Sequence, residues 1–506
     1  MAKILGVSCS LRNARFGSGS DSLIDEIKAL DDQDALQAYL ENQTRIRAAD
    51  FIEAGREEGL PFDKIYRNLK KAKGDQGLSN SEAALVASLW GAHREDCEIA
   101  HVGLSPFFPM NGPAVDLDEL RKIVLDSDGL IISGPVYFGD RGSLAQSFLE
   151  FLRDDPECAE HVRGKIYGGI AVGAKRNGGQ ETTLIYQLVD ITNLNMLAVG
   201  NDSSTTSQYG GTVVAGDVGT MPDDPYGMKT SIGTGMRVAR VVQVMEAGAT
   251  GDLVDKTKIS VWLLQDSAGH EGRSYIEKLC ADVEKANPDV SFEVMDFTQE
   301  EIFRCIACDV CPVDTGPPEE YRCIIKNGGD LFARMHEQLV DCDAILVAAY
   351  SPEDRRDLKS VYQRFVERTR YLRRDDYVIG ERLVAPLVIS ELNARQNLHI
   401  RMMTSFIRHN SVMHHSLIGM EMEGRIINWQ RLLEQTTKFA ETARQVTVGR
   451  IMRSGDASID THYNPVGYVI SAEKRSVDAE KGKVEDSDEI RRANRDQEVR
   501  RRLVRG

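Results

Sequence analysis

Short runs of apolar, largely β-branched residues alternate along this chain with long polar stretches that have helical spacing. The strand candidates are residues 4–8, 130–133, 166–172, 259–264, 344–349 and 384–390. Strands that are apolar throughout, rather than at every second position, are typical of parallel sheets with both faces covered. The alternation therefore predicts βαβ units and the α/β class, with doubly wound parallel sheets and helices on both faces.

The strand candidates divide the 506 residues into two similar halves. Lys3 and Lys258 open the two halves 255 positions apart, whereas Ile131 and Ile345 in the next matched strands are 214 apart. The first half therefore has about 41 additional residues, which we assign to a helical insertion at about 28–81. We expect a first domain at 1–251, a second at 252–447, and a C-terminal extension with a charged tail at 448–506, solvated or disordered.

Composition excludes two classes of protein. The chain has 62 Lys and Arg against 78 Asp and Glu, a formal charge of −16, which argues against a nucleic-acid partner. No apolar run approaches the ~20 residues that span a bilayer, so we expect no membrane span. Because the N-terminus leads directly into a strand-like run, it does not resemble a signal peptide, and we expect a cytoplasmic protein.

Three polar, glycine-containing loops follow three strand candidates of the first half. The first is rich in Ser and Gly and opens a helix, which suits a phosphate group, although it fits neither of the two common nucleotide-binding loop patterns. The second holds Tyr137 and Phe138, and the third is rich in Gly. Because the carboxyl ends of parallel strands meet at one edge, the loops predict a binding cleft there.

The three loops contain the strings GVSCSLR at 6–12, PVYFG at 135–139 and RNGGQETTL at 176–184. With these strings the chain resembles the flavodoxin-like NAD(P)H-dependent FMN reductases, above all the branch with iron–sulfur flavoproteins and the quinone reductases of the tryptophan-repressor-binding type. It implies two tandem flavodoxin-like domains with FMN in the first. It places the FMN phosphate at Ser8, Ser10, Arg12, Ser18 and Ser20, and the flavin ring at Pro135, Val136, Tyr137, Phe138, Gly139, Lys175, Asn177, Gly178 and Gly179.

Four cysteines crowd together in the second half, at Cys305, Cys308, Cys311 and Cys323. Four thiolates at this spacing can enclose a [4Fe–4S] cluster or a zinc ion, and free thiols are the remaining alternative. The resemblance to iron–sulfur flavoproteins implies the [4Fe–4S] cluster. The second half's own flavin loops are degenerate, with Asp266 and Glu271 where a phosphate would lie, so we expect one flavin site, in the first half.

The resulting hypothesis is an FMN-dependent NAD(P)H oxidoreductase. It passes electrons to a small-molecule acceptor such as a quinone or a flavin, to a redox partner protein, or to a cluster in its second domain. We expect a homo-oligomer or an internal pseudo-dimer, and the sequence identifies no catalytic acid or base, as suits flavin chemistry. The alternative is a non-catalytic flavin- or metal-binding assembly or sensor protein. His409, His414 and His415 lie in a helix-like run at 397–415 and complete no ligand set, so we expect structural histidines.

Overall fold

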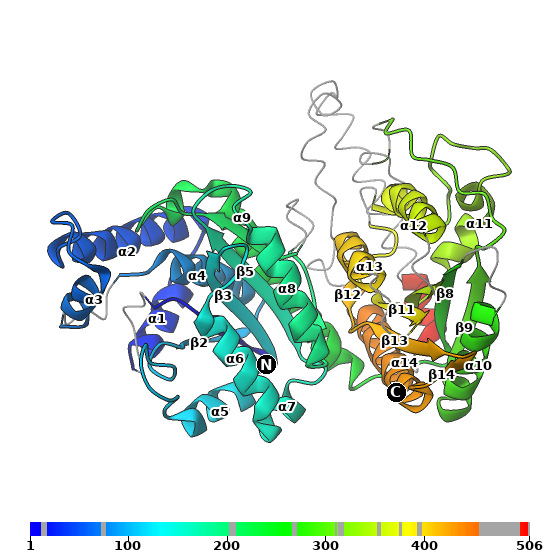
Figure 1. Cartoon of the computed structure of the whole chain (residues 1–506), viewed down its shortest axis with the longest axis horizontal. Helices are drawn as coiled ribbons and strands as arrows, with labels where there is room; N and C mark the ends of the chain where they lie inside the picture. Colours follow the sequence, from blue (N-terminus) through cyan, green and yellow to red (C-terminus); the bar gives the residue numbers. More distant parts are fainter. Residues whose placement is uncertain are drawn as a thin grey trace. The chain divides into compact units, whose positions relative to one another are not determined.

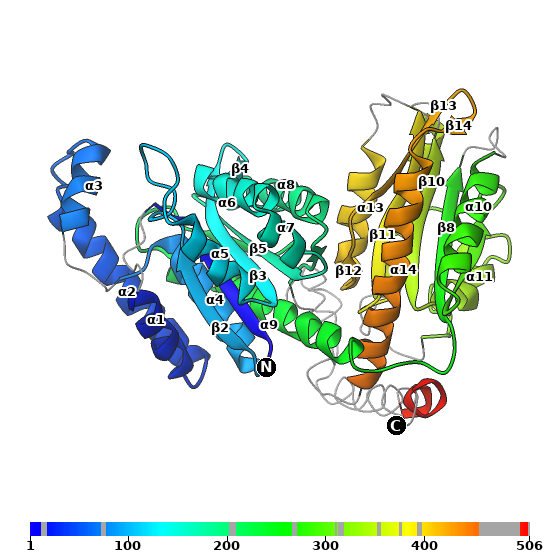
Figure 2. The same cartoon turned by 90° about the horizontal axis from the view of Figure 1, so that it is seen from below.

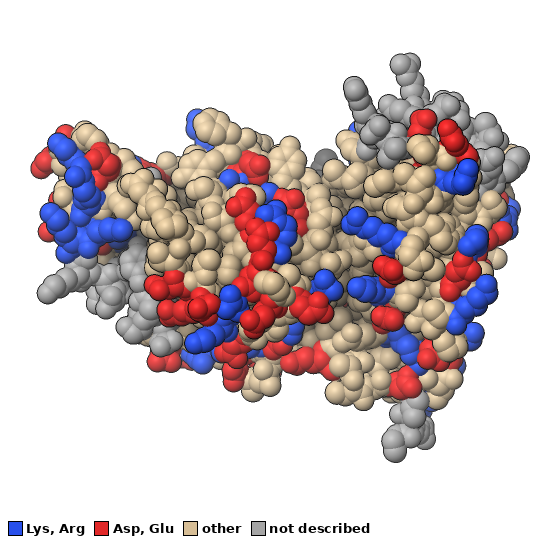
Figure 3. All heavy atoms as spheres, turned by 60° about the horizontal axis from the view of Figure 1, so that its bottom comes forward, with Lys and Arg blue, Asp and Glu red and all other residues tan. Residues whose placement is uncertain are grey.

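The computed structural model (Figure 1) consists of two compact units, Met1–Val242 and Gln243–Gly506, which are described separately. The structure describes residues 1–11, 18–71, 77–201, 209–265, 271–308, 311, 318–351, 356–373, 377–391, 397–454 and 496–503. Within this part of the chain, no helix is long and apolar enough to span a membrane. On the face shown in Figure 3, Lys and Arg are interspersed with Asp and Glu, so this face offers no broad basic surface for nucleic acid.

The first unit contains a parallel sheet with strand order β2-β1-β3-β5, and β6 and β7 both pair with β5. Its strands are β1 (Lys3–Ser8), β2 (Glu98–Gly103), β3 (Gly129–Tyr137), β5 (Ile166–Gly173), β6 (Leu197–Ala198) and β7 (Gly211–Val214), and β4 (Asp140–Arg141) turns back antiparallel on β3. The central strands are almost wholly buried, which explains their continuous apolar runs.

Helices cover both faces of this sheet. The helices of the unit are α1 (Ser18–Lys28), α2 (Gln33–Glu53), α3 (Phe62–Lys71), α4 (Asn80–Arg94), α5 (Leu117–Leu125), α6 (Ser143–Asp154), α7 (Pro156–His161), α8 (Gln180–Asn193), η1 (Met221–Asp223) and α9 (Pro225–Gly248), whose end is counted with the second unit. Consecutive residues of a strand face opposite sides of the sheet. A Cβ on Gly168 of β5 would meet Val238 of α9, and one on Gly169 would meet Leu184 of α8, so these two helices lie on opposite faces. The predicted α/β class is confirmed.

The second unit has a sheet of the same kind, with strand order β9-β8-β10-β11 and with β12 and β13 beside β11. Its strands are β8 (Thr257–Gln265), β9 (Val290–Asp296), β10 (Ala344–Ser351), β11 (Leu383–Glu391), β12 (Val412–Met413), β13 (Leu417–Met422) and the antiparallel β14 (Arg425–Ile426). Its helices are α10 (Glu271–Ala286), α11 (Leu331–Val340), α12 (Arg356–Arg368), η3 (Thr369–Arg373), α13 (Leu398–Phe406), η4 (Ile407–His409) and α14 (Trp429–Met452).

The same polar contact occurs within each unit, at the start of its sheet. The backbone N–H of Lys3 donates to Asp128 Oδ2 at 3.1 Å, and that of Lys258 donates to Asp343 Oδ2 at 2.9 Å. The lysines are 255 positions apart and the aspartates 215, so the first unit has 40 additional residues up to this point. The sequence alignment on Ile131 and Ile345 was out of register by one residue. The two units thus have the same strand order and the same contact at the start of their sheets.

The end of the chain packs against the second unit. Arg502, in the charged tail that we expected to be solvated or disordered, is buried and donates to both oxygens of Asp343 at 2.7 Å. Its Nε donates to Asp255 at 2.9 Å, and Leu503 pairs with Leu253 in an isolated bridge. These contacts fasten residues 496–503 beside the start of β8.

Candidate functional site

The first predicted loop follows β1 and lies against β3. Ser8 pairs with Ser133 across the sheet, and the N–H of Cys9 donates to the carbonyl of Ser133 at 2.9 Å. Ser8 and Ser10 are both buried. Arg12 lies outside the described residues, and Ser18 and Ser20 fall in the first turn of α1, where only the backbone is described. The structure thus places the start of this loop at the carboxyl edge, as expected.

Cys9 is also buried in this loop. Burial raises the pKa of its thiol far above the ordinary value, because the thiolate would lose its solvation. A Cβ on Gly134 would lie 3.1 Å from Cys9 Cβ, so the side chain fills the space between the first loop and β3. Cys9 therefore packs between the first loop and β3, and burial favours its protonated thiol.

The second loop exposes its aromatic side chains. Tyr137 is 55% exposed and Phe138 108%, so neither belongs to the core. Phe138 adopts a left-handed backbone conformation (φ 53°) at the tip of the turn between β3 and β4. An apolar ring in a strained conformation and in full contact with solvent is costly while nothing covers it.

The third loop leads from β5 into α8 and is fastened by Gln180. The Nε2 of this buried glutamine donates to the carbonyl oxygens of Lys175 at 2.8 Å and Val213 at 3.2 Å, and its Oε1 accepts from the N–H of Gly178 at 2.9 Å. Gly179 has φ 103°, and a Cβ there would lie 2.7 Å from the Cα of Gly139. The second and third loops are therefore in direct contact, and residues from both converge on one edge.

A fourth segment, which the sequence analysis did not assign to the site, is the start of α4. The hydroxyl of Ser133 donates to the carbonyl of Ser81 at 2.7 Å, which places this helix start beside the ends of β1 and β3. Ser79 caps the helix by accepting from the N–H of Glu82 at 3.3 Å. The pattern Ser-x-x-Glu before an apolar run, at residues 79–82, is typical of a helix N-terminus and could have indicated this helix start. The sequence prediction instead assigns residues 79–81 to the end of the helical insertion.

The loop between β7 and α9 contacts the third loop at this edge of the sheet. Asp224 accepts from the backbone N–H of Val214 at 2.7 Å and from Arg176 Nη2 at 2.5 Å. Arg176 also donates to the carbonyl of Thr212 at 3.0 Å, and its guanidinium lies 5.1 Å from the centre of the Tyr226 ring. Asp224 thus holds Arg176 of the third loop in a fixed position.

The cysteines of the second unit lie in the connection between β9 and α11. Burial, together with the neighbouring Cys323, Cys308 and Cys305, raises the pKa of the Cys311 thiol to about 12. The four thiols are therefore close enough to interact electrostatically. Among the described residues, however, no three His, Cys, Asp or Glu side chains converge as metal ligands. The donor set suits a thiolate-bound metal, but its geometry here is not closed around one.

A buried ion pair supports this cysteine connection. Arg368 donates to both oxygens of Asp330 at 3.0 and 2.9 Å, and both side chains are buried. Its Nη2 also donates to the hydroxyl of Tyr321 at 2.8 Å and lies 3.8 Å from Cys323 Sγ. Asp330 accepts in addition from the N–H of Phe303 at 3.0 Å, so both ends of the connection meet at one carboxylate.

Comparison with known proteins identifies the family of this chain. The sequence profile of the NADPH-dependent FMN reductase family matches residues 78–210, which begin at α4 and include the second and third loops. An iron–sulfur flavoprotein of Methanocaldococcus jannaschii is 39% identical over 132 residues, 26% of this chain and 67% of that protein. The chain belongs to the NAD(P)H-dependent FMN reductase and iron–sulfur flavoprotein family. It is thus a flavodoxin-like, flavin-dependent oxidoreductase.

Two further relatives of this FMN reductase family were found. An iron–sulfur flavoprotein of Methanosarcina thermophila is 26% identical over 199 residues, 38% of this chain and 85% of that protein. An NAD(P)H dehydrogenase (quinone) of Azorhizobium caulinodans is 29% identical over 135 residues, 26% of this chain and 62% of that protein. The profile match ends before the second unit, whose three corresponding loops fall largely on residues 266–270, 352–355 and 392–396, outside the described part of the chain.

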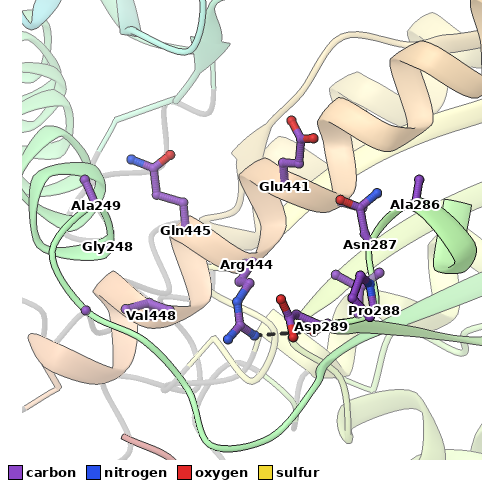
Figure 4. Close-up of a pocket in the computed structure, with 13 residues that line it drawn as sticks. Gly248, Ala249, Ala286, Asn287, Pro288, Asp289, Glu441, Arg444, Gln445 and Val448 are labelled. Carbon is purple, nitrogen blue, oxygen red and sulfur yellow. Dashed lines mark hydrogen bonds between the residues drawn. The ribbon is translucent and has the colours of Figure 1, made fainter. Parts of the chain in front are cut away.

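A hollow in the second unit lies apart from these loops, between the end of α9, α14 and the turn before β9 (Figure 4). Its cation, Arg444, donates to the carbonyl oxygens of Asp289, Asp255 and Leu253, each at 3.3 Å, and forms an ion pair with Asp252. Arg444 therefore ties the start of β8 to the turn before β9, and we assign no ligand to this hollow.

The three histidines are buried, as expected of structural residues, although the predicted helix does not reach them all. It ends with η4 at His409, and His414 and His415 follow β12. Burial lowers the pKa of His409 and His414 well below 6.5, and that of His415 to about 4.

These shifts predict a loss of stability in mild acid. The unfolded chain takes up protons near pH 6.5 while folded His415 stays neutral, so the free energy of unfolding falls from about pH 6.5 to about pH 4. The slope contributed by each such histidine is at most about 1.4 kcal/mol per pH unit. Urea unfolding midpoints at about pH 7 and pH 5 check this. A His415→Gln variant should lose less between the two pH values than the unmodified protein, and an equal loss would contradict the assignment.

Proposed function

We propose that the first unit binds FMN at the carboxyl edge of its sheet. The phosphate lies against Ser8 and Ser10 after β1 and against the start of α4, where Ser79, Ser81 and the helix N-terminus favour an anion. Arg12, Ser18 and Ser20 stay in the proposal through the family resemblance. The α4 start adds to the phosphate site predicted from sequence, which lies wholly before residue 21.

The flavin ring lies on the second and third loops. The observation that carries this is the meeting of Gly139 and Gly179 beside the exposed ring of Phe138. A Cβ on Gly139 would have nothing within 4 Å, so open space lies over this glycine. A flat aromatic group fits such a space, with Pro135, Val136, Tyr137 and Phe138 on one side and Lys175, Asn177, Gly178 and Gly179 on the other.

Bound FMN supplies hydride and electron transfer between NAD(P)H and an acceptor such as a quinone or a flavin. The chain's own residues position that chemistry. Gln180 and Asp224 hold the third loop, and Phe138 offers a face for stacking.

We further propose that Cys305, Cys308, Cys311 and Cys323 hold a [4Fe–4S] cluster. Support comes from their spacing, from their electrostatic proximity, and from Arg368 and Arg370, cations that lie near these thiols. Because the geometry is not closed around a metal, no electron-transfer step is assigned to it. Zinc in the same site is the competing outcome of the experiment below.

The test is an absorption spectrum with iron, zinc and FMN analysis on anaerobically purified protein, followed by NADPH oxidation with menadione as acceptor. We expect a yellow protein with FMN in the first unit and turnover that depends on it. FMN without NAD(P)H oxidation would favour a sensor or assembly protein. A colourless protein that binds no added FMN would overturn the flavin proposal, and an iron-free, zinc-bearing protein would overturn the cluster.

A further inference from the structure

Two helices between β1 and β2 form an arm on the first unit, which we define as residues 33–71 with α2 and α3. The profile match to the FMN reductase family begins at residue 78, so the arm lies outside it. In both Figure 1 and Figure 2, α2 lies between α3 and the rest of the first unit. Its contacts therefore show what the arm does for the site.

The arm packs on the segment between β7 and α9, which we call the mouth loop (residues 215–224). Arg56, after α2, forms an ion pair with Asp217 of the mouth loop, and Gln37 Nε2 donates to the carbonyl of Pro222 at 3.1 Å. Gly219 has φ 84°, and a Cβ there would lie 2.9 Å from the carbonyl oxygen of Thr44. Only a glycine allows this approach of the two backbones.

The mouth loop also completes the hydrophobic core of the arm. Phe51 and Ala54 at the end of α2 cluster with Ile65 and Leu69 of α3, and Val218 packs against this cluster. Two helices alone bury little apolar surface, so a side chain from the mouth loop is a substantial part of what holds the arm together. The arm and the mouth loop therefore form one packed body.

The opposite side of the mouth loop is fastened to the proposed flavin site. Asn80 at the start of α4 donates to the carbonyl of Asp217 at 2.7 Å and accepts from the N–H of Met221 at 3.2 Å. At the end of the mouth loop, Asp224 forms an ion pair with Arg176 of the third loop. Contacts thus run without a break from the arm through the mouth loop to both the phosphate side and the ring side of the cleft.

We infer that the arm is a specificity element, which holds the mouth loop as a fixed rim of the flavin cleft and thereby selects small planar electron acceptors over bulky ones. This inference rests on the proposed flavin site. A rim packed on both sides does not swing aside, so an acceptor of the size of a simple quinone reaches the flavin more easily than one of the size of free FMN. Loss of the contacts between the arm and the mouth loop therefore lets an acceptor of the size of free FMN reach the bound flavin.

Two variants of the full chain release the rim in different ways. The double substitution Gln37→Ala and Arg56→Ala removes the polar contacts, and Val218→Asp places a charge against the apolar cluster. The control is Arg67→Ala, which breaks an Arg–Asp pair with Asp63 inside α3, at 2.6 Å, and leaves the contacts to the mouth loop in place. Each protein is assayed with menadione and with free FMN as acceptor. Hydrogen exchange of residues 215–224 and the content of bound FMN are measured alongside.

We expect faster exchange in the mouth loop of both release variants. We also expect kcat/KM for free FMN to rise at least about fivefold relative to menadione, while the control and the bound FMN stay unchanged. Faster exchange with an unchanged ratio would overturn the inference and leave the flavin site intact. An unmodified protein without flavin-dependent turnover would overturn the proposed function, and the inference with it.

Discussion

Replacing Arg368 with methionine should lower the free energy of unfolding of the second unit by about 3–5 kcal/mol. Asp330 is wholly buried, and both its oxygens accept from Arg368. Methionine keeps much of the side-chain volume but leaves a carboxylate in the interior without its cation. Removal of one partner from a buried pair costs this much because the remaining charge has lost its solvation as well.

The measurement is denaturant unfolding followed by tryptophan fluorescence in a Trp90→Phe background. Of the three tryptophans, only Trp90 lies in the first unit, and Trp262 is fully buried in the second. The matched control is Arg273→Met, which breaks a half-exposed pair with Glu277 on α10 and should change little. The double variant Arg368→Met with Asp330→Asn should recover part of the loss, because no buried charge is then left unpaired. A loss in Arg368→Met no larger than in the control would contradict this account.

The central strands of both units could be predicted from sequence, and the edge strands could not. Residues 166–172 and 344–349 were expected as strands, and the structure has β5 at Ile166–Gly173 and β10 at Ala344–Ser351. Both are buried along their whole length, which leaves a continuous apolar run in the sequence. By contrast, β9 has only two buried positions, so its sequence mixes Ser and Glu with apolar residues and gives no such signal.

The candidate site divides in the same way. The second and third loops directly follow strands, so their place at one edge followed from the rule for parallel sheets. Several other contacts at the candidate sites did not, because they join residues far apart in the chain. Arg176 of the third loop meets Asp224 across 48 positions, Asn80 meets the carbonyl of Asp217 across 137, and Arg368 beside the cysteines meets Asp330 across 38. A single sequence shows each of these residues as an ordinary polar side chain, and only the fold brings the partners together.

A second large effect is expected at Gly179, where alanine should weaken FMN binding roughly tenfold to a hundredfold. Two causes act together at this position. Its φ of 103° is one that residues with a Cβ rarely adopt, and the new Cβ would lie 2.7 Å from the Cα of Gly139. The clash pushes the second loop away from the third, which separates the two surfaces between which the flavin ring is proposed to lie. Titration of the apoprotein with FMN, followed by quenching of flavin fluorescence, measures the dissociation constant.

Gly112→Ala separates the strain from the clash. Gly112 has a closely similar φ of 100°, yet a Cβ there would have nothing within 4 Å. This control carries the backbone cost without moving a loop of the site, so it should lower thermal stability slightly and leave FMN affinity unchanged. If both variants bound FMN as tightly as the unmodified protein, contact between Gly139 and Gly179 would have no part in holding the ring. If only Gly179→Ala lost affinity, the spacing of the two loops would be the property that binding requires, because backbone strain is common to both variants.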